Sequence, residues 1–304
     1  MNNMQLNEGL SQISLLFVYA AMAIYTFSFL AFATNLSRLA SNKDETRATA
    51  SGAEKFGTVM LVLAGLLHGV AVVLRGISAN RVPWANMYEF TLTGSFIVVT
   101  IYLIAMRLKD VRLIATFISG VTLLALGLAT SIWYVQVKTL MPALQSYWLV
   151  IHVLVAVLAT AFFNIAAAFS VVYLVRNAGW MVKAKSKALL FFRRILELFP
   201  TSEKLEKLAY RFNIIGFILW SFTLIAGAIW AERAWHRYWG WDTKEVWTFI
   251  IWTIYAGYLH ANATRGWTGK RSAWLSLVGF VAILFNFTIV NLFFKGLHVY
   301  SGLK

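Results

Sequence analysis

Eight long stretches without a charged residue are the feature that most limits how this chain can fold. They cover residues 9–37, 56–74, 90–106, 113–137, 139–175, 212–231, 246–264 and 272–294. A helix needs about 20 mostly apolar residues to cross a bilayer, with about 17 as the lower limit, and each stretch is long enough. Only helices and closed barrels satisfy every backbone group in hydrocarbon, and these stretches lack the alternation of barrel strands. The sequence therefore predicts an all-α, polytopic membrane protein with about eight transmembrane helices.

The lysines and arginines are distributed unevenly between the loops. Of the 27 such residues, 19 fall in one set of alternate loops and 7 in the other. Cytoplasmic loops carry the excess of positive charge in membrane proteins. We therefore expect a multi-pass protein of the cell (plasma) membrane with both termini on the outer face. The net charge of +15 is then a topology signal, and no nucleic-acid partner is expected.

Residues 177–211 form a polar insertion in what we expect to be a single membrane domain, residues 1–304. The segment "KAKSKALLFFRRILELF" is basic and amphipathic, and Pro200 follows it. Thr201 or Ser202 is placed to cap the next helix. A basic amphipathic helix beside a bilayer usually lies in the headgroup layer of the anionic inner leaflet. We therefore predict a cytoplasmic insertion that packs on the membrane, with partner docking as the alternative.

Residues 230–247, the tryptophan loop, are predicted to face outward. Their segment "WHRYWGWDTKEVW" contains four indoles: Trp235, Trp239, Trp241 and Trp247. A membrane anchor needs only one or two, and indoles supply flat apolar area at low entropic cost. The loop therefore favours a flat ligand. Asp242 and Glu245 have a second interpretation, as the capping residues of the helix that follows.

The histidines stand at different predicted depths. His68 is near the middle of the second helix and His260 in the inner half of the seventh. His152 begins the fifth helix and His298 follows the eighth, both near the outer surface, while His236 lies in the tryptophan loop. Haem iron takes two axial ligands, and histidine is a common donor. Two pairs at two depths favour two haems, although a single buried imidazole bonded to a neighbouring helix, or metal bound by His alone, would also fit.

Arg75 lies seven residues beyond His68, about two turns, and so on nearly the same helix face. A cation within the span needs a partner, and haem carries two propionates. Snorkelling of Arg75 to the headgroups is the alternative. Arg233, Arg237 and Lys244 of the tryptophan loop are further candidates to hold propionates. The chain has no cysteine, so any redox chemistry has to come from a bound cofactor or a partner.

Three segments resemble the CcsA (ResC) family of cytochrome c biogenesis proteins. "WAERAWHRYWGWDTKEVW" resembles the WWD signature of haem-handling proteins. "YLHANATRGWTGKRSA" and the terminal "GLHVY" resemble the segments that follow it in this family. "HGVAVVLRGISANRVPWANMYEF" is similar to the family's second-helix histidine and its Asn-x-Tyr-Glu segment, here Asn86, Tyr88 and Glu89, to which no chemistry is assigned.

The resemblance implies a function in the System II pathway of cytochrome c maturation. Such proteins bind haem within the membrane, carry it to the outer face and present it to apocytochrome c, at a Cys-x-x-Cys-His motif, together with a ResB/Ccs1-type membrane partner. By position, His68 and His260 would ligate a membrane haem b. His152 and His298 would ligate an outer haem above Trp235, Trp239, Trp241 and Asp242. His236 stands where a small residue is expected in relatives.

Two other functions remain open at this point. A b-type electron-transfer protein would use buried bis-histidine haem without an open outer site, and a permease would use no haem. The sequence shows no nucleophile or general base, so this chain is expected to be the haem-delivery or haem-lyase subunit of a cytochrome c synthase complex.

Overall fold

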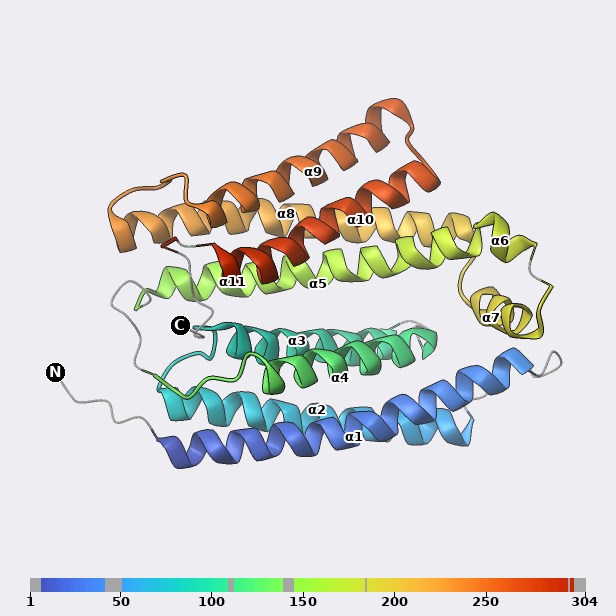
Figure 1. Ribbon diagram of the computed structural model, residues 1–304, viewed down its shortest axis with the longest axis horizontal. Helices are drawn as coiled ribbons and strands as arrows, with labels where there is room; N and C mark the ends of the chain where they lie inside the picture. The colour runs from blue at the N-terminus through green and yellow to red at the C-terminus, as the bar shows by residue number, and fades with distance from the viewer. Residues whose placement is uncertain are drawn as a thin grey trace. The chain divides into compact units, whose positions relative to one another are not determined.

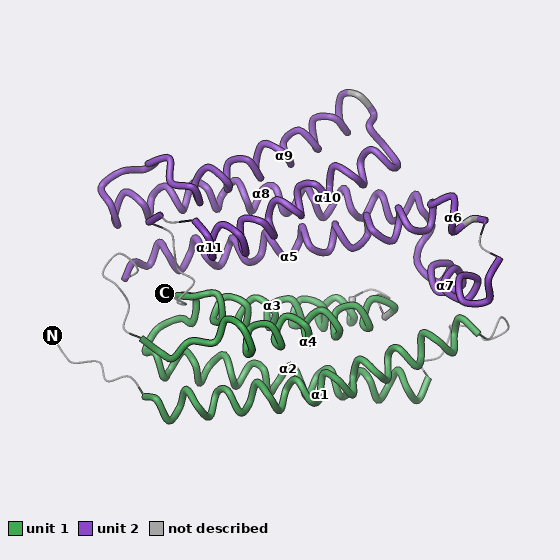
Figure 2. The backbone as a smooth tube through the Cα atoms, viewed as in Figure 1, with its two compact units in different colours: residues 1–139, 302–304 green, residues 140–301 purple. Residues whose placement is uncertain are grey.

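Helices account for all the regular secondary structure in the part of the chain that the structure describes. The computed structural model describes residues 7–41, 51–108, 112–138, 145–183, 185–294 and 296–297, and every element there is helical (Figure 1). The predicted all-α class is therefore confirmed. The chain divides into two compact units, residues 1–139 with 302–304, and residues 140–301 (Figure 2).

Unit 1 is a bundle of four long helices within its described residues. They are α1 (Glu8–Ser41), α2 (Gly52–Ala79), α3 (Met87–Leu108) and α4 (Ala115–Ser131), with a short 3₁₀ turn, η1 (Arg112–Ile114), before the last. Each helix packs on the next along the chain, and α4 packs back on α1, which closes the ring. Local sequence sets the ends: the side chain of Ser51 accepts a hydrogen bond from Glu54 N, and Asn80 ends α2 in the left-handed conformation, φ 50°.

Unit 2 contains a second ring of four long helices. In chain order its elements are α5 (Tyr147–Arg176), α6 (Gly179–Val182), α7 (Lys187–Leu198), α8 (Ser202–Trp235), α9 (Thr243–Arg265), α10 (Lys270–Phe285), the π-helical turn η3 (Asn286–Val290) and α11 (Asn291–Phe293). Helices α5, α8, α9 and α10 pack in that order, and α10 packs back on α5.

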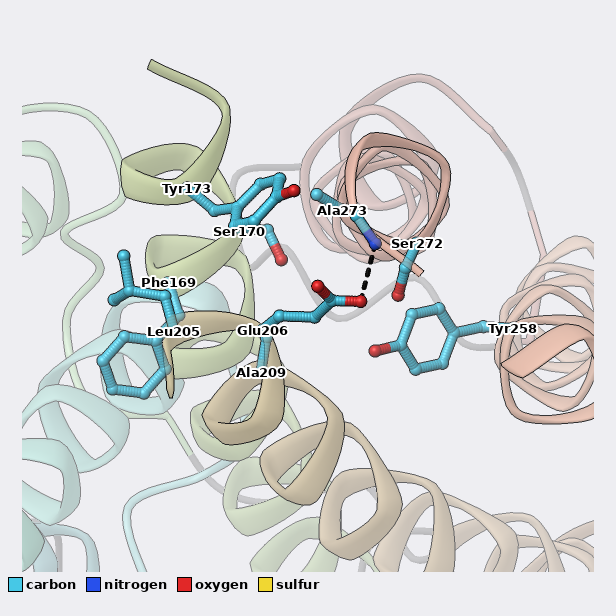
Figure 3. Close-up of a pocket in the computed structure, with 10 residues that line it drawn as sticks. Phe169, Ser170, Tyr173, Leu205, Glu206, Ala209, Tyr258, Ser272 and Ala273 are labelled. Carbon is cyan, nitrogen blue, oxygen red and sulfur yellow. Dashed lines mark hydrogen bonds between the residues drawn. The ribbon is translucent and has the colours of Figure 1, made fainter. Parts of the chain in front are cut away.

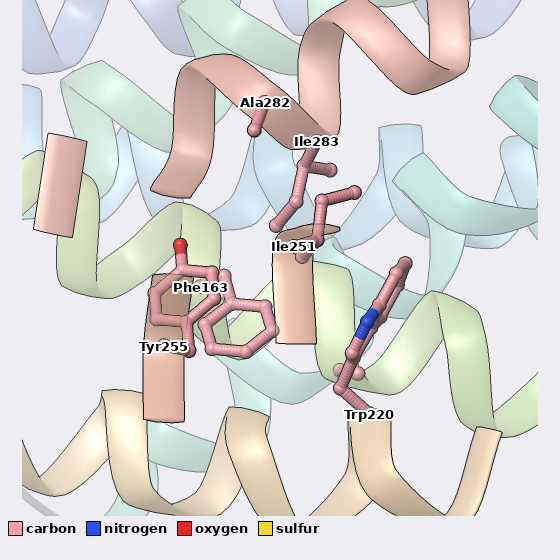
Figure 4. Close-up of a cluster of buried hydrophobic side chains, with 7 residues drawn as sticks. Phe163, Trp220, Ile251, Tyr255, Ala282 and Ile283 are labelled. Carbon is pink, nitrogen blue, oxygen red and sulfur yellow. The ribbon is translucent and has the colours of Figure 1, made fainter. Parts of the chain in front are cut away.

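The core of unit 2 draws side chains from all four helices of the ring (Figure 4). Phe163 of α5 stacks on Tyr255 of α9, with ring centroids 3.7 Å apart and planes 13° apart. Trp220 of α8 and Ile283 of α10 complete the cluster. Helices in lipid gain little from the hydrophobic effect, so close packing of this kind is what holds such a bundle together.

A helix occupies most of each of the eight predicted stretches, but the boundaries differ. Within the described residues, six helices are long and apolar enough to cross a membrane: α1, α2, α3, α5, α8 and the segment Lys270–Phe293. Helix α4 has only 17 residues, because the chain leaves the helix after Ser131, and α9 is not among the six. Helix α9 is rich in Trp, Tyr and Thr, which are uncharged yet not strongly apolar. The absence of charge alone overestimates how apolar such segments are. The count of eight spans therefore stays a prediction.

The polar insertion, residues 177–211, contains an amphipathic helix, α7. Helix α7 carries the basic amphipathic segment, and it is seen nearly end-on in Figure 1 while α5 and α8 run across the view. Arg176 donates hydrogen bonds to the carbonyls of Phe199 and Pro200, which ties the end of α7 to the end of α5. Residues 202–211 are the first turns of the 34-residue α8, which Thr201 caps.

Candidate functional site

The tryptophan loop is built around one carboxylate. Helix α8 ends at Trp235, and Glu245 lies in the first turn of α9. Glu245 Oε2 accepts hydrogen bonds from Gly240 N at 2.8 Å and Asp242 N at 3.0 Å, the two residues on either side of Trp241. Asp242 caps α9 in return, so the capping box predicted from the sequence is present. The loop is therefore a rigid turn with Trp241 at its tip.

Trp241 is held in a costly conformation. Its φ is +59°, in the left-handed region that bulky residues avoid, and its side chain is 77% exposed. Strain of this kind costs about 1–3 kcal/mol and persists where the surroundings impose it. Here the hydrogen bonds that Glu245 accepts from Gly240 N and Asp242 N impose this backbone conformation on Trp241. An indole displayed at that expense is a candidate contact for a ligand or partner.

The loop indoles do not form one flat plate. The rings of Trp239 and Trp241 lie edge to face, 5.9 Å apart at 89°, and Trp239 meets Phe249 in the same way at 6.4 Å. Trp247 packs against Phe285 of α10, with centroids 4.4 Å apart, and belongs to the packing of the bundle. The exposed surface therefore offers one indole face with another indole edge beside it.

Asp242 also binds the chain that follows the last helix. Its Oδ1 accepts a hydrogen bond from Leu297 N at 3.0 Å, and its carboxylate packs directly against Gly296. His298 comes next in the chain and lies outside the described residues. Asp242 thus joins the tryptophan loop to the residues that lead into His298, a role that its position in the sequence did not reveal.

His152 has the hydrogen-bonding pattern of a metal ligand. Its Nδ1 is 2.9 Å from the carbonyl oxygen of Thr223 on α8, and because a carbonyl only accepts, Nδ1 carries the proton. The lone pair of the neutral ring is then on Nε2, and ligating histidines typically donate their other ring nitrogen to such an acceptor. The ring stacks on Trp230, at 6.0 Å and 18°, and Trp230 meets Trp235 at 4.8 Å. Gly227 faces the imidazole, because a Cβ there would lie 2.8 Å from its Cε1.

His68 is fully buried in unit 1, and both its ring nitrogens are bonded to protein. Nε2 lies 2.9 Å from the carbonyl oxygen of Leu92, so it carries the proton, and the hydroxyl of Tyr25 donates to Nδ1 at 3.2 Å. In this arrangement His68 links α1, α2 and α3 and presents no ring nitrogen to a metal. His260 is an exposed residue of α9 in unit 2. The pairing of His68 with His260 therefore stays a prediction.

Arg75 has a protein counter-ion. It is fully buried, and its guanidinium donates to Glu89 Oε1 at 3.1 Å, to Ser11 Oγ at 2.9 Å and to the carbonyl of Val135 at 2.8 Å. Arg81 forms a second ion pair with the same carboxylate. The need for a partner, which suggested a haem propionate for Arg75, is met here by Glu89.

The Asn-x-Tyr-Glu segment acquires a structural role from the same cluster. Asn86 Oδ1 accepts a hydrogen bond from Glu89 N at 2.9 Å at the start of α3, and the ring of Tyr88 lies 5.1 Å from the Arg75 guanidinium. Glu89 is the only acidic residue between Glu54 and Asp110. That isolation, close to an arginine inside a span, was the signal in the sequence for this pair.

Lys244 was a candidate to hold propionates, and the sequence did not reveal that its ammonium group has partners in the protein. It lies at the start of α9, outside the predicted span, and its Nζ donates to the carbonyl of Asn286 and to Asn291 Oδ1, both at 2.8 Å. Burial lowers the pKa of Lys244 to about 7, and the nearby Asp242 carboxylate opposes this shift. The other loop cations also have partners: Arg237 donates to the carbonyl of Gly240 in the loop, and Arg233 lies 5.2 Å from the ring of Tyr147 at the start of α5. His236 is the exposed cap of α8, at φ 57°.

A small cavity lies at the opposite end of unit 2 (Figure 3). Glu206 of α8 points into it and accepts a hydrogen bond from Gly269 N, the cap of α10, at 2.6 Å. Tyr173, Tyr258 and Ser272 line the same space. Glu206 therefore supplies the side-chain cap that α10 lacks in its own sequence.

The end of unit 2 that carries the tryptophan loop fits a haem ligand set in part. His152 supplies a ring nitrogen of the right tautomer, Gly227 leaves room for that ring, and Trp241 supplies exposed indole. Among the described residues, no group of three or more His, Asp or Glu is placed to hold a bare metal ion.

Comparison with known proteins identifies the family of the chain. The chain matches the family described as "Cytochrome C assembly protein" over residues 84–298. It is 35% identical over 262 residues to a cytochrome c biogenesis protein CcsA of Prochlorococcus marinus, covering 80% of this chain and 83% of the relative. The CcsA proteins of Guillardia theta (35% identity, 80% and 84% covered) and Synechococcus elongatus (31% identity, 82% and 88% covered) are similar to it as well.

A solved structure shares the fold. The cytochrome c heme lyase CcmF superposes with a TM-score of 0.62 over 94% of this chain, at 16% sequence identity. This chain spans 47% of that protein, about half its length. The family expected from the tryptophan loop is thus confirmed: the chain belongs to the cytochrome c assembly protein family, with CcsA proteins as its relatives.

Proposed function

We propose that this chain matures c-type cytochromes: it binds haem within the membrane, carries it to the outer face and presents it for covalent attachment to apocytochrome c. The family supports the process. The observation that carries the haem-binding part is His152, whose Nδ1–H is fixed by the Thr223 carbonyl and whose lone pair is therefore on Nε2. A ligand held in this way is oriented before the iron arrives.

At the outer site, His152 and His298 are the proposed axial ligands of a haem b, and Trp235, Trp239, Trp241 and Asp242 are its proposed surroundings. The haem supplies vinyl groups that accept the cysteine thiols of a Cys-x-x-Cys-His motif as thioethers. The residues of this chain bind and orient. Asp242 holds the residues before His298, and Glu245 holds the neighbours of Trp241, so these residues would orient a bound haem for the incoming peptide.

The membrane pair, His68 and His260, is the second part of the proposal, and Arg75 is included with it as a cofactor contact. In the structure Nε2 of His68 donates to Leu92 and Nδ1 accepts from Tyr25. Ligation of iron by His68 therefore requires one of these hydrogen bonds to be exchanged for the metal. Two haem b sites per chain follow from the two pairs.

The surroundings complete the proposal. We assign the chain to the plasma membrane, as one domain with eight spans, with the termini and the tryptophan loop on the outer face and residues 177–211 on the cytoplasmic face. A ResB/Ccs1-type membrane protein is the proposed partner, and apocytochrome c is the substrate. This chain then provides the haem-delivery part of a cytochrome c synthase complex.

The test is to purify the full-length protein from cells supplied with haem, and to record its Soret band, reduced α-band and pyridine haemochrome. We expect protein-bound haem b, and a clear loss of the outer haem in His152→Ala. His236→Asn is the matched control, because His236 is exposed and Asn tolerates its left-handed backbone. A colourless wild-type protein would refute the haem proposal. Equal loss from both variants would refute the role of His152.

A further inference from the structure

The side chain of Lys244 connects the tryptophan loop to the C-terminal end of the last long helix. Its ammonium has two partners on that helix, the carbonyl of Asn286 and the side-chain oxygen of Asn291. Both distances are 2.8 Å, within the range of good hydrogen bonds. A partly buried ammonium without such partners would be costly, so this contact is a strong local constraint.

Lys244 contacts that helix where its backbone is irregular. Residues Asn286–Val290 form the π-helical turn η3, which inserts an extra residue into the helix. The Asn286 carbonyl at its start accepts from Lys244. Asn291 Nδ2 donates to the carbonyl of Phe287 at 2.7 Å while its Oδ1 accepts from Lys244. The side chains of Lys244 and Asn291 thus each donate a hydrogen bond to a carbonyl of the turn.

The π-helical turn decides where the following residues lie. One extra residue rotates everything after it by about 100° relative to a regular α-helix. Side chains of the tryptophan loop and of α9 contact the last helix before, within and after this turn. Trp247 packs on Phe285 before the turn, Lys244 donates to Asn286 within it, and Asp242 accepts from Leu297 N after it. If the turn relaxed to regular helix, Leu297 would be displaced from Asp242.

We propose that Lys244 is a positioning residue that preserves η3 and thereby keeps Gly296 and Leu297 against Asp242. We call the contacts of Lys244 with Asn286 and Asn291, together with that of Asp242 with Leu297, the clamp. The clamp fixes the tryptophan loop relative to the residues that lead into the proposed ligand His298. This inference rests on the proposed function for its purpose, but its geometry involves only described residues of unit 2.

The first test needs no haem. Hydrogen–deuterium exchange of the full-length, haem-free protein in lipid nanodiscs is followed on a peptide that contains Leu297. We expect its amide, which donates to Asp242, to exchange at least about tenfold faster in Lys244→Met and in Asn291→Leu. Asn291→Asp keeps an acceptor for Lys244 but loses the donor to the Phe287 carbonyl, so its exchange should lie between wild type and Asn291→Leu. Lys207→Met removes an exposed lysine paired with Glu203 and is the matched control.

Unchanged exchange at Leu297 in Lys244→Met would overturn the clamp. If Lys244→Met instead loses protection throughout α8 and α9, Asn291→Leu decides, because it leaves the contact of Lys244 with Asn286. The double variant should add little to either single variant, since both break one unit.

A second measurement separates the clamp from the proposed function. In haem-loaded protein, Lys244→Met should release the outer haem about 10–100-fold faster, as expected when the support of a ligand is removed. Faster exchange at Leu297 together with a wild-type protein that binds no haem would refute the proposed function and leave the clamp standing. Normal exchange with normal haem binding would refute the clamp alone.

Discussion

Replacing Gly227 by Ala tests whether the position of the His152 ring is what makes it a ligand. A Cβ at residue 227 would lie 2.8 Å from His152 Cε1 and 2.9 Å from Nδ1. Ordinary contact begins at 3.4 Å, so the ring has to retreat by roughly half an ångström. A shift of that size away from α8 stretches the 2.9 Å bond to the Thr223 carbonyl beyond good hydrogen-bond length.

Two effects on stability oppose each other in Gly227→Ala. Alanine favours a helix interior over glycine by about 1 kcal/mol, whereas overpacking costs about 1–3 kcal/mol. The net loss of stability is then no more than about 2 kcal/mol, and the protein should still fold. The effect on haem is larger than the effect on folding, because loss of the hydrogen bond that orients a ligating histidine lowers metal affinity about 10–100-fold.

The assay is the rate at which the purified protein loses haem to an excess of apomyoglobin, measured from the Soret band. Gly257→Ala on α9 is the matched control, since a Cβ there has no atom within 4 Å. We expect Gly227→Ala to approach the release rate of His152→Ala, and Gly257→Ala to match wild type. Wild-type haem retention in Gly227→Ala, with rapid loss in His152→Ala, would show that the ring's position does not matter and would refute the reasoning.

Three further predictions concern other parts of the chain. Glu89→Gln leaves Arg75 and Arg81 without their shared counter-ion and should lower stability by about 3–5 kcal/mol, seen as reduced yield and melting temperature, whereas Glu203→Gln on the surface should not. Trp241→Gly removes the indole and the backbone strain together, so the outer haem should be released faster while the melting temperature holds or rises; an unchanged release rate would contradict the role of the indole. Lys244 has a pKa of about 7 in the fold and 10.5 as the ordinary value, so the unfolded chain binds more protons between these limits. Stability should therefore rise from pH 7 to 9, by at most about 1.4 kcal/mol per pH unit, and this rise should be smaller in Lys244→Met.

The positions of the long helices could be read from the sequence because charge is excluded from hydrocarbon wherever it has no partner. The capping box of Asp242 and Glu245 was predictable too, because it depends on residues three apart. Local spacing also placed the cap of α8 at Thr201 or Ser202, and the structure uses Thr201. Each of these features needs only neighbours in the chain.

Contacts between distant segments escaped prediction. The π-helical turn in the last helix has no sequence signature. Its contact with the loop joins Lys244 to Asn286, which are 42 residues apart. The pair of Arg75 with Glu89 crosses from α2 to α3. The contact of Asp242 with Leu297 spans 55 residues. In each case the proximity of the two partners depends on tertiary packing.

The two buried histidines show why depth alone is a poor criterion for a haem ligand. His68 was singled out because it lies deep in a span, yet the structure uses its Nε2–H to satisfy the Leu92 carbonyl and its Nδ1 to accept from Tyr25. His152 lies nearer the end of its helix, and its bond to Thr223 leaves the ring in the tautomer that ligates through Nε2. Both histidines bond a carbonyl of a neighbouring helix, and which ring nitrogen makes that bond decides which nitrogen carries the lone pair.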